Sequence, residues 1–230
     1  MKRIFFYLLF WTLSTAAAGQ NCARMYDYFK EGVTLEYTSF DKKDRVESVM
    51  TQRVSKVEER ADTLVAVFDV TTVDGKGKNA RKSTLPIKCH AGIIYVDLQT
   101  VVPMPENSEE MADMQMEMRG SDLSFPPGMR PGQTLADADM ELSVRMGGVQ
   151  IMNTQYRIFN RKVEAQESMT TAAGTFDCLK ITYDMEYKLL GKHQMRTEYW
   201  YSPSVGMVKS VTYDQKGKGE TRMELTKMTQ

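Results

Sequence analysis

The sequence has little of the equipment that enzymes and metal proteins commonly use. Its 230 residues include only 2 His and 3 Cys. The GxSxG motif of hydrolases, the HExxH motif of zinc proteases, the P-loop and the dinucleotide-binding glycine motif are all missing. The 30 Lys and Arg balance 30 Asp and Glu, so no net positive charge is available to attract nucleic acid. These absences predict a protein that is not an enzyme, carries no cofactor and binds no nucleic acid.

Long apolar runs are also missing, except at the beginning of the chain. Residues 1–18 comprise the cations Lys2 and Arg3, an apolar run over 4–13 and small residues up to Ala18. This order of segments is the pattern of a secretory signal peptide. We therefore expect the protein to be periplasmic or otherwise exported.

The mature chain is expected to span residues 19–230 as a single β-rich domain. It contains no run of about 18 apolar residues, so we expect no transmembrane segment. Lipid attachment at Cys22 is not expected, because the Leu that a lipoprotein signal places three residues upstream is missing. Removal of Lys2 and Arg3 leaves 28 cationic against 30 anionic side chains. This balance predicts no electrostatic attraction to anionic lipid head groups.

The three cysteines enter an oxidising compartment if the chain is exported. One disulfide and one remaining thiol is then the expected outcome, but the pairing among Cys22, Cys89 and Cys178 stays open. Cys89 is followed by His90, which raises the question of a catalytic pair. Because neighbouring residues of a strand point to opposite faces, we expect a structural cysteine instead.

Alternation of apolar and polar residues dominates the mature sequence. In 180–189, five apolar side chains share one face of a predicted strand: Ile181, Tyr183, Met185, Tyr187 and Leu189. Similar stretches are 139–146, 64–70 and 33–37. Turn residues separate them at 41–44, 74–77, 147–148 and 215–219. The pattern predicts an all-β protein, mainly antiparallel, with about ten strands in a curved sheet, half-barrel, sandwich or barrel.

Methionine is unusually frequent, with 18 residues. The segment over 106–112 predicts a short helix that passes into a strand carrying Met114, Met116 and Met118. Clustered thioethers, together with His193 and Met195, suit Cu(I). However, alternate residues on one strand face lie about 6 to 7 Å apart, too far for neighbours to chelate one ion. We therefore expect no metal site, and interpret the methionines as adaptable apolar filling.

Methionine and tyrosine side chains on one sheet face also suit a binding surface for an apolar ligand. Unbranched thioethers repack at low cost, which favours variable ligands. The residues predicted to line such a surface are Met114, Met116, Met118, Tyr183, Met185 and Tyr187.

Four blocks resemble the TapB-like family of exported proteins of unknown function. They are NRKVEAQESMTTAAGTFDCLKITYDMEY at 160–187, EYWYSPSVGMVKSVTYDQKGK at 198–218, IKCHAGIIYVDL at 87–98 and RGSDLSFPPGMRPGQTLADA at 119–138. The resemblance covers most of the mature chain. It implies a curved antiparallel half-barrel similar to that of envelope lipoprotein carriers, and it implies no reaction.

The leading hypothesis is a non-enzymatic cell-envelope module whose apolar concave face accepts a lipid or a segment of a partner protein, with 106–118 as a lid or plug. A structural or assembly component of an envelope complex is the alternative, and Cu(I) binding by the methionines is a third, less favoured hypothesis. The sequence leaves the oligomeric state open.

Overall fold

The computed structural model describes residues 22, 26–60, 62–98, 114–188 and 191–230. The signal peptide predicted over 1–18 and the helix predicted over 106–112 lie outside these residues. All elements within them are strands: β1 (Thr34–Asp41), β2 (Val46–Arg60), β3 (Thr63–Asp74), β4 (Arg81–His90), β5 (Ile93–Asp97), β6 (Met114–Gly120), β7 (Asp122–Phe125), β8 (Ala138–Met146), β9 (Val149–Thr171), β10 (Gly174–Lys188), β11 (Lys192–Ser202), β12 (Gly206–Tyr213) and β13 (Gly219–Thr229).

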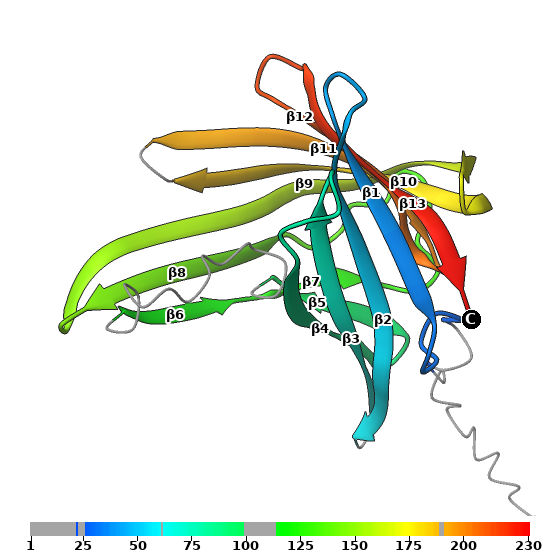
Figure 1. Ribbon diagram of the computed structural model, residues 1–230, viewed down its shortest axis with the longest axis horizontal. Helices are drawn as coiled ribbons and strands as arrows, with labels where there is room; N and C mark the ends of the chain where they lie inside the picture. Colours follow the sequence, from blue (N-terminus) through cyan, green and yellow to red (C-terminus); the bar gives the residue numbers. More distant parts are fainter. Residues whose placement is uncertain (1–21, 23–25, 61, 99–113, 189–190) are drawn as a thin grey trace, which may run out of the picture.

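These strands form one antiparallel sheet in the order β6-β8-β9-β10-β11-β12-β13-β1-β2-β3-β4-β5-β7. The sheet curves so strongly that it nearly closes into a barrel (Figure 1). The predicted all-β, antiparallel class is confirmed. The structure has 13 strands where about ten were expected, because β5 and β7 are only 5 and 4 residues long and are too short to show a clear alternation.

A single stretch of chain brings the two edges of the sheet together. β6 pairs with β8 at one edge, and after Ser121 the chain continues as β7, which pairs with β5 at the other edge. The backbone N–H of Ser121 donates to the carbonyl of Asp139 at 2.9 Å, and its hydroxyl accepts from the N–H of Asp139 at 2.9 Å. A Cβ atom on Gly120 would lie 2.3 Å from the carbonyl oxygen of Asp139. Only glycine therefore allows the close approach at this seam.

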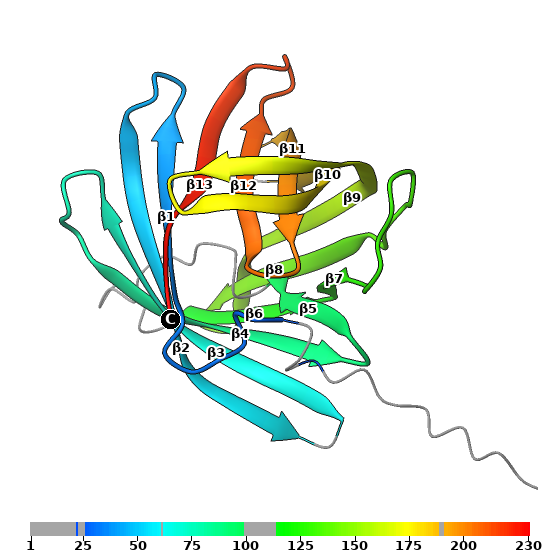
Figure 2. The ribbon, with the colours of Figure 1, turned by 90° about the vertical axis from the view of Figure 1, so that its right-hand side faces the viewer.

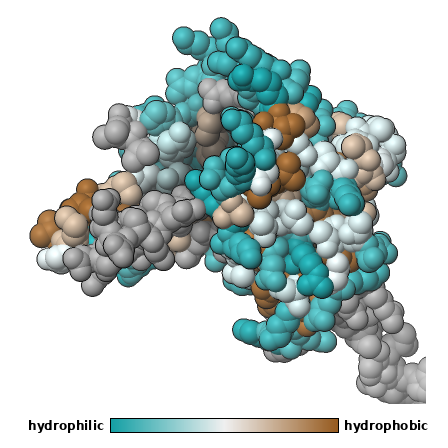
Figure 3. All heavy atoms as spheres, viewed as in Figure 1, coloured by the Kyte–Doolittle hydropathy of each residue, from teal (hydrophilic) through white to brown (hydrophobic). Residues whose placement is uncertain are grey.

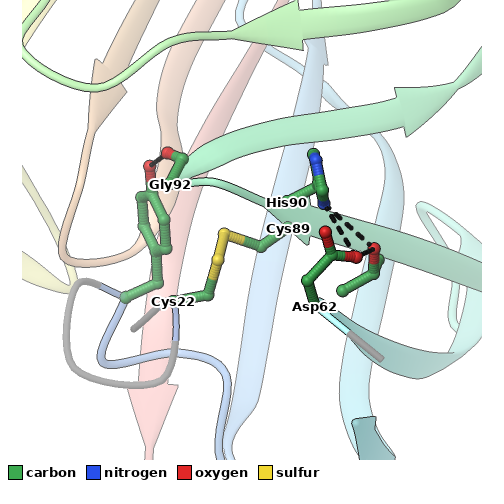
Figure 4. Close-up of a disulfide and its surroundings, with 7 residues drawn as sticks. Cys22, Asp62, Cys89, His90 and Gly92 are labelled. Carbon is green, nitrogen blue, oxygen red and sulfur yellow. Dashed lines mark hydrogen bonds and ion pairs between the residues drawn. A yellow bond between two sulfur atoms is a disulfide. The ribbon is translucent and has the colours of Figure 1, made fainter. Parts of the chain in front are cut away.

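One end of the barrel is filled by the segment that precedes β1. Tyr28 and Phe29 are buried there and pack against Phe68 of β3, with ring centroids 6.3 and 6.4 Å apart. The Tyr26 hydroxyl donates to the carbonyl of Gly92 at 2.8 Å (Figure 4). These contacts make the segment a plug of packed rings at this end of the barrel.

A disulfide between Cys22 and Cys89 fixes the same plug to β4 (Figure 4). Cys178 is a buried free thiol, so the expected outcome of one disulfide and one thiol is confirmed. His90 points away from Cys89, and its Nδ1 lies 3.3 Å from both Asp62 and Thr63. A Cys89–His90 pair is therefore excluded, as the strand geometry predicted.

The loops of the sheet divide between two rims, because alternate strands of an antiparallel sheet run in the same direction. The loops after β8, β10, β12, β1 and β3 lie at one rim, here called the lysine rim for the residues that it carries. The loops after β7, β9, β11, β2 and β4, together with the plug, form the plugged rim. In Figure 2 the β1–β2, β3–β4 and β12–β13 loops extend away from the β2–β3 and β4–β5 turns.

No helix among the described residues is long and apolar enough to cross a membrane.

Candidate functional site

The concave face of β9, β10 and β11 gathers aromatic and thioether side chains near the lysine rim. Strand alternation directs Tyr183, Met185 and Tyr187 of β10 to this face, as the sequence predicted. Tyr183 and Met185 are half-buried and pack with Met118 against a small apolar cluster, which consists of Leu98, Ala138, Met140 and Ile158. The structure therefore brings three of the six predicted residues together.

The other three predicted residues lie elsewhere on the same wall or beyond it. Met114 and Met116 belong to β6, opposite Met146 and Val144 of β8, and their side chains are not among the described parts of the structure. Tyr187 lies farther along β10, outside the small apolar cluster.

Tyr187 is the centre of a stack of three rings, each from a different strand. Its ring lies 5.6 Å from that of Tyr156 and 4.9 Å from that of His193, with interplanar angles of 21° and 13°. The register opposes Tyr187 to Tyr156 on one side and to His193 on the other. Cross-strand pairing thus builds a flat aromatic strip along the wall.

A pocket of about 320 Å³ opens beside this strip at the lysine rim. It is lined by Tyr187, Lys192, His193, Gln194, Met195, Asp214, Gln215 and Lys216. Its volume is within the range of small-molecule sites. Lys192 pairs with Glu186 at 2.9 Å and is exposed. Apolar ring surface and cationic groups therefore meet in one place, an arrangement that suits a ligand with an apolar body and an anionic group.

Arg161 is a buried charged residue that the sequence did not predict. Its side chain is 1% exposed, and it donates to the carbonyls of Ser124 at 2.8 Å and Ala136 at 2.6 Å. Its guanidinium lies 5.2 Å from the centre of the Phe125 ring. Burial lowers the pKa of Arg161 to about 10, so the group is still cationic at neutral pH. Arg161 thereby links β9 both to β7 and to the segment that precedes β8.

A bulge in β9 turns Arg161 inward. The register of β9 against β10 shifts between Thr182 and Asp184, and Asn160 takes a left-handed φ of 54°. The signal in the sequence is the spacing of Ile158 and Val163, which both face inward although they are five residues apart. An odd spacing between two buried residues requires one extra residue in the strand.

Buried aromatic residues also cross the interior of the barrel. Phe125 of β7 stacks on Tyr199 and Tyr201 of β11, with centroids 5.8 and 5.0 Å apart. Burial raises the pKa of Tyr28, Tyr37 and both β11 tyrosines above the usual value. These tyrosines are therefore neutral at physiological pH and pack as uncharged rings in the core.

A second pocket, of about 310 Å³, lies at the plugged rim. It is lined in part by Tyr26, Met129, Cys178 and Tyr201. Burial raises the pKa of the Cys178 thiol to about 11, and its Sγ lies 3.6 Å from the carbonyl of Phe176. The protonated thiol is a poor nucleophile.

The described residues contain no cluster of three or more His, Cys, Asp and Glu side chains arranged to hold a metal ion. His193 and Met195 do share one strand face, as predicted, but His193 stacks on Tyr187.

Comparison with solved structures identifies the same fold in two bacterial proteins. A protein of Bacteroides fragilis, described as exported and as having a YmcC-like fold, has a TM-score of 0.70 and 22% identity, with 87% of this chain and 97% of that chain covered. A protein of Parabacteroides distasonis, described as a lipoprotein, has a TM-score of 0.68 and 22% identity, with 87% and 96% covered. At this identity the likeness concerns the fold.

No curated protein matches the sequence. A sequence model of a family described as DUF3108-like matches residues 30–225. The TapB-like assignment is not confirmed and stays a prediction. The match extends over most of the strands of the barrel, and the chain therefore belongs to the DUF3108-like family.

Proposed function

We propose that the protein is a non-enzymatic binding module of the cell envelope, which holds the apolar part of a ligand against the concave face of β9, β10 and β11. The signal peptide predicted at the N-terminus supports this location, as do the exported protein and the lipoprotein among its structural relatives. The ligand class is a lipid or another molecule with an apolar body and one anionic group.

The observation that carries this proposal is the pocket at the lysine rim. There the Tyr187 ring and the Met195 thioether lie beside Lys192 and Lys216. Rings and thioethers contact an apolar body without demanding one shape, and Lys216 supplies a partner for an anionic group.

The proposal is tested first with protein purified from its own host. Native mass spectrometry should detect a bound small molecule, and organic extraction should release it. The same measurement on a Tyr187→Ala, Met195→Ala double variant should show the bound fraction greatly reduced.

A second test uses anilinonaphthalene sulfonate, a dye with an apolar ring system and one anion. The double variant should weaken dye binding about tenfold, which corresponds to the loss of roughly 1.4 kcal/mol of contact. Tyr95→Ala is the matched control, because Tyr95 lies on β5, away from the pocket lining. If no molecule is bound in the native protein, and the double variant binds the dye as tightly as the control, the proposal is wrong.

A further inference from the structure

The charges of the loops differ sharply between the two rims. Among the described residues, which do not include the connection from β5 to β6, and counting each loop with the strand residue on either side, the lysine rim carries ten cationic side chains: Lys42, Lys43, Arg45, Lys76, Lys78, Arg81, Lys188, Lys192, Lys216 and Lys218. Against them are four anions: Asp41, Asp44, Asp74 and Asp214. Counted in the same way, the described loops of the plugged rim carry two Arg and two Asp: Arg60, Arg130, Asp62 and Asp137. The neutral total of the chain hides this separation.

Three of the cationic loops are built by the same local device. In DKKDR at 41–45, DGKGK at 74–78 and DQKGK at 214–218, the first Asp accepts two backbone N–H groups of its own loop at 2.8 to 3.0 Å. The third and fifth residues of each loop are then Lys or Arg, and all six of them are exposed. The aspartate is thus used to shape the turn, while the cations project from it.

The lysine rim also carries the exposed apolar side chains. The structure exposes four large hydrophobic residues among those that it describes: Val46 at 44%, Met146 at 46%, Val149 at 66% and Ile151 at 49%. Val46 follows the β1–β2 loop, and the other three lie at the tip of the β8–β9 hairpin. This hairpin extends beyond the body of the barrel (Figure 1), and its tip is visibly hydrophobic (Figure 3).

From this arrangement we infer that the lysine rim docks onto the surface of an anionic phospholipid bilayer. The lysine loops contact the head-group phosphates, and Met146, Val149 and Ile151 enter the boundary between head groups and acyl chains. Cations with apolar side chains beside them are the combination that binds such interfaces.

Other partners fit the rim less well. A soluble polyanion would use the lysines but would leave the exposed apolar tip in water. A protein partner would favour a continuous apolar patch. Here the exposed apolar residues lie in two separate places, at Val46 after the β1–β2 loop and at the tip of the β8–β9 hairpin.

The test is cosedimentation of the full chain with two kinds of vesicle. One is pure phosphatidylcholine, and the other contains equal parts of phosphatidylcholine and phosphatidylglycerol. Strong binding is expected to the anionic vesicles alone. It should disappear at about 1 M salt, where the Debye length falls to roughly 3 Å.

Charge-reversal variants test whether the lysine rim, and not the rest of the surface, binds the anionic vesicles. Because each lysine near an anionic surface contributes about fivefold to binding, Lys42→Glu, Lys76→Glu and Lys78→Glu together should weaken binding by about a hundredfold or more. The matched control reverses three exposed lysines away from the lysine rim, with Lys30→Glu, Lys56→Glu and Lys227→Glu. This control should leave strong binding to anionic vesicles.

Insertion of the hairpin tip is followed with a fluorescent reporter. Tryptophan emission of Val149→Trp should shift to the blue on addition of anionic vesicles. Ala172→Trp, in the β9–β10 turn of the plugged rim, should show no shift.

The inference is overturned if neither vesicle is bound, if both are bound equally, or if the two triple variants bind alike. It is also overturned if the two tryptophan reporters respond in the same way. These measurements use loop residues outside the ligand pocket, so their failure is independent of dye binding at Tyr187 and Met195.

Discussion

The two rims of the barrel differ in the kind of residue that they concentrate. The plugged rim concentrates a disulfide, buried rings such as Tyr28 and Phe29, and turns with few charges. The lysine rim concentrates exposed cations and the exposed hydrophobic tip of the β8–β9 hairpin. Buried contacts stabilise a fold, whereas exposed charge contributes little to it. The comparison indicates that, of the two rims, the plugged rim contributes more to folding stability, whereas the lysine rim is available for recognition.

The largest expected effect comes from opening the plugged rim. Cys22 and Cys89 are 67 residues apart in sequence, so their cross-link should stabilise the protein by about 4 kcal/mol. Replacing both with Ser should lower the free energy of unfolding by about this amount in chemical denaturation.

Cys178→Ser is the control for that variant, since it removes a sulfur from the core without breaking a cross-link. Its loss should stay near 1 kcal/mol. If the double variant loses no more than the control, the plugged rim does not dominate stability.

An intermediate effect is expected at Arg161, which links β9 to the place where the two edges of the sheet meet. Arg161→Met keeps much of the apolar volume but leaves the carbonyls of Ser124 and Ala136 without their donor. We expect a loss of about 3 kcal/mol in the free energy of unfolding, with faster hydrogen exchange in β7. Arg157→Met, at an exposed position of the same strand, should change stability by less than about 0.5 kcal/mol. Equal losses in the two variants would contradict this role.

The smallest effect concerns the aspartates that shape the lysine loops. Hydrogen bonds from Arg45 lower the pKa of Asp41 to about 2, and backbone N–H groups lower the pKa of Asp74 and Asp214. Because the folded pKa lies below the unfolded value of about 3.9, the stabilisation is present above that value. It is lost as pH falls through the folded pKa.

Denaturation curves between about pH 5 and pH 2.5 measure this loss. Changing all three aspartates to Asn keeps an acceptor in each turn but removes the titration. The triple variant should therefore show a shallower fall in stability with acid than the unmodified protein. A fall of the same steepness would show that these turns do not carry the acid sensitivity.

Sequence patterns predicted the strands and the turns where local rules decide them. The alternation of Ile181, Tyr183, Met185 and Tyr187 was sufficient to predict β10, and Gly147-Gly148 was sufficient to predict the β8–β9 turn. A two-residue turn with both glycines at positive φ is favoured by its own backbone. Neither prediction needed knowledge of distant residues.

Features that depend on distant partners were not predicted. The pairing of Cys22 with Cys89 depends on where the plug meets β4. The inward direction of Arg161 depends on a bulge. Its hydrogen bonds depend on carbonyl groups that lie 25 and 37 residues away in sequence. Of the predicted site residues, Tyr183 and Met185 pack with Met118. Their contact with a ligand stays a prediction.

The pairing of β1 with β13 has a consequence for how the chain is assembled. Thr34 lies opposite Thr229, and the hydroxyls of Thr38 and Thr226 are 3.0 Å apart although 188 residues separate them in sequence. Strand β1 therefore keeps one unpaired edge until the last strand arrives, and pairing between such distant strands is slow. A chain that is threaded through a membrane from its N-terminus would thus remain incomplete during transit. β13 therefore completes the pairing of β1 only after the strands between them have been delivered.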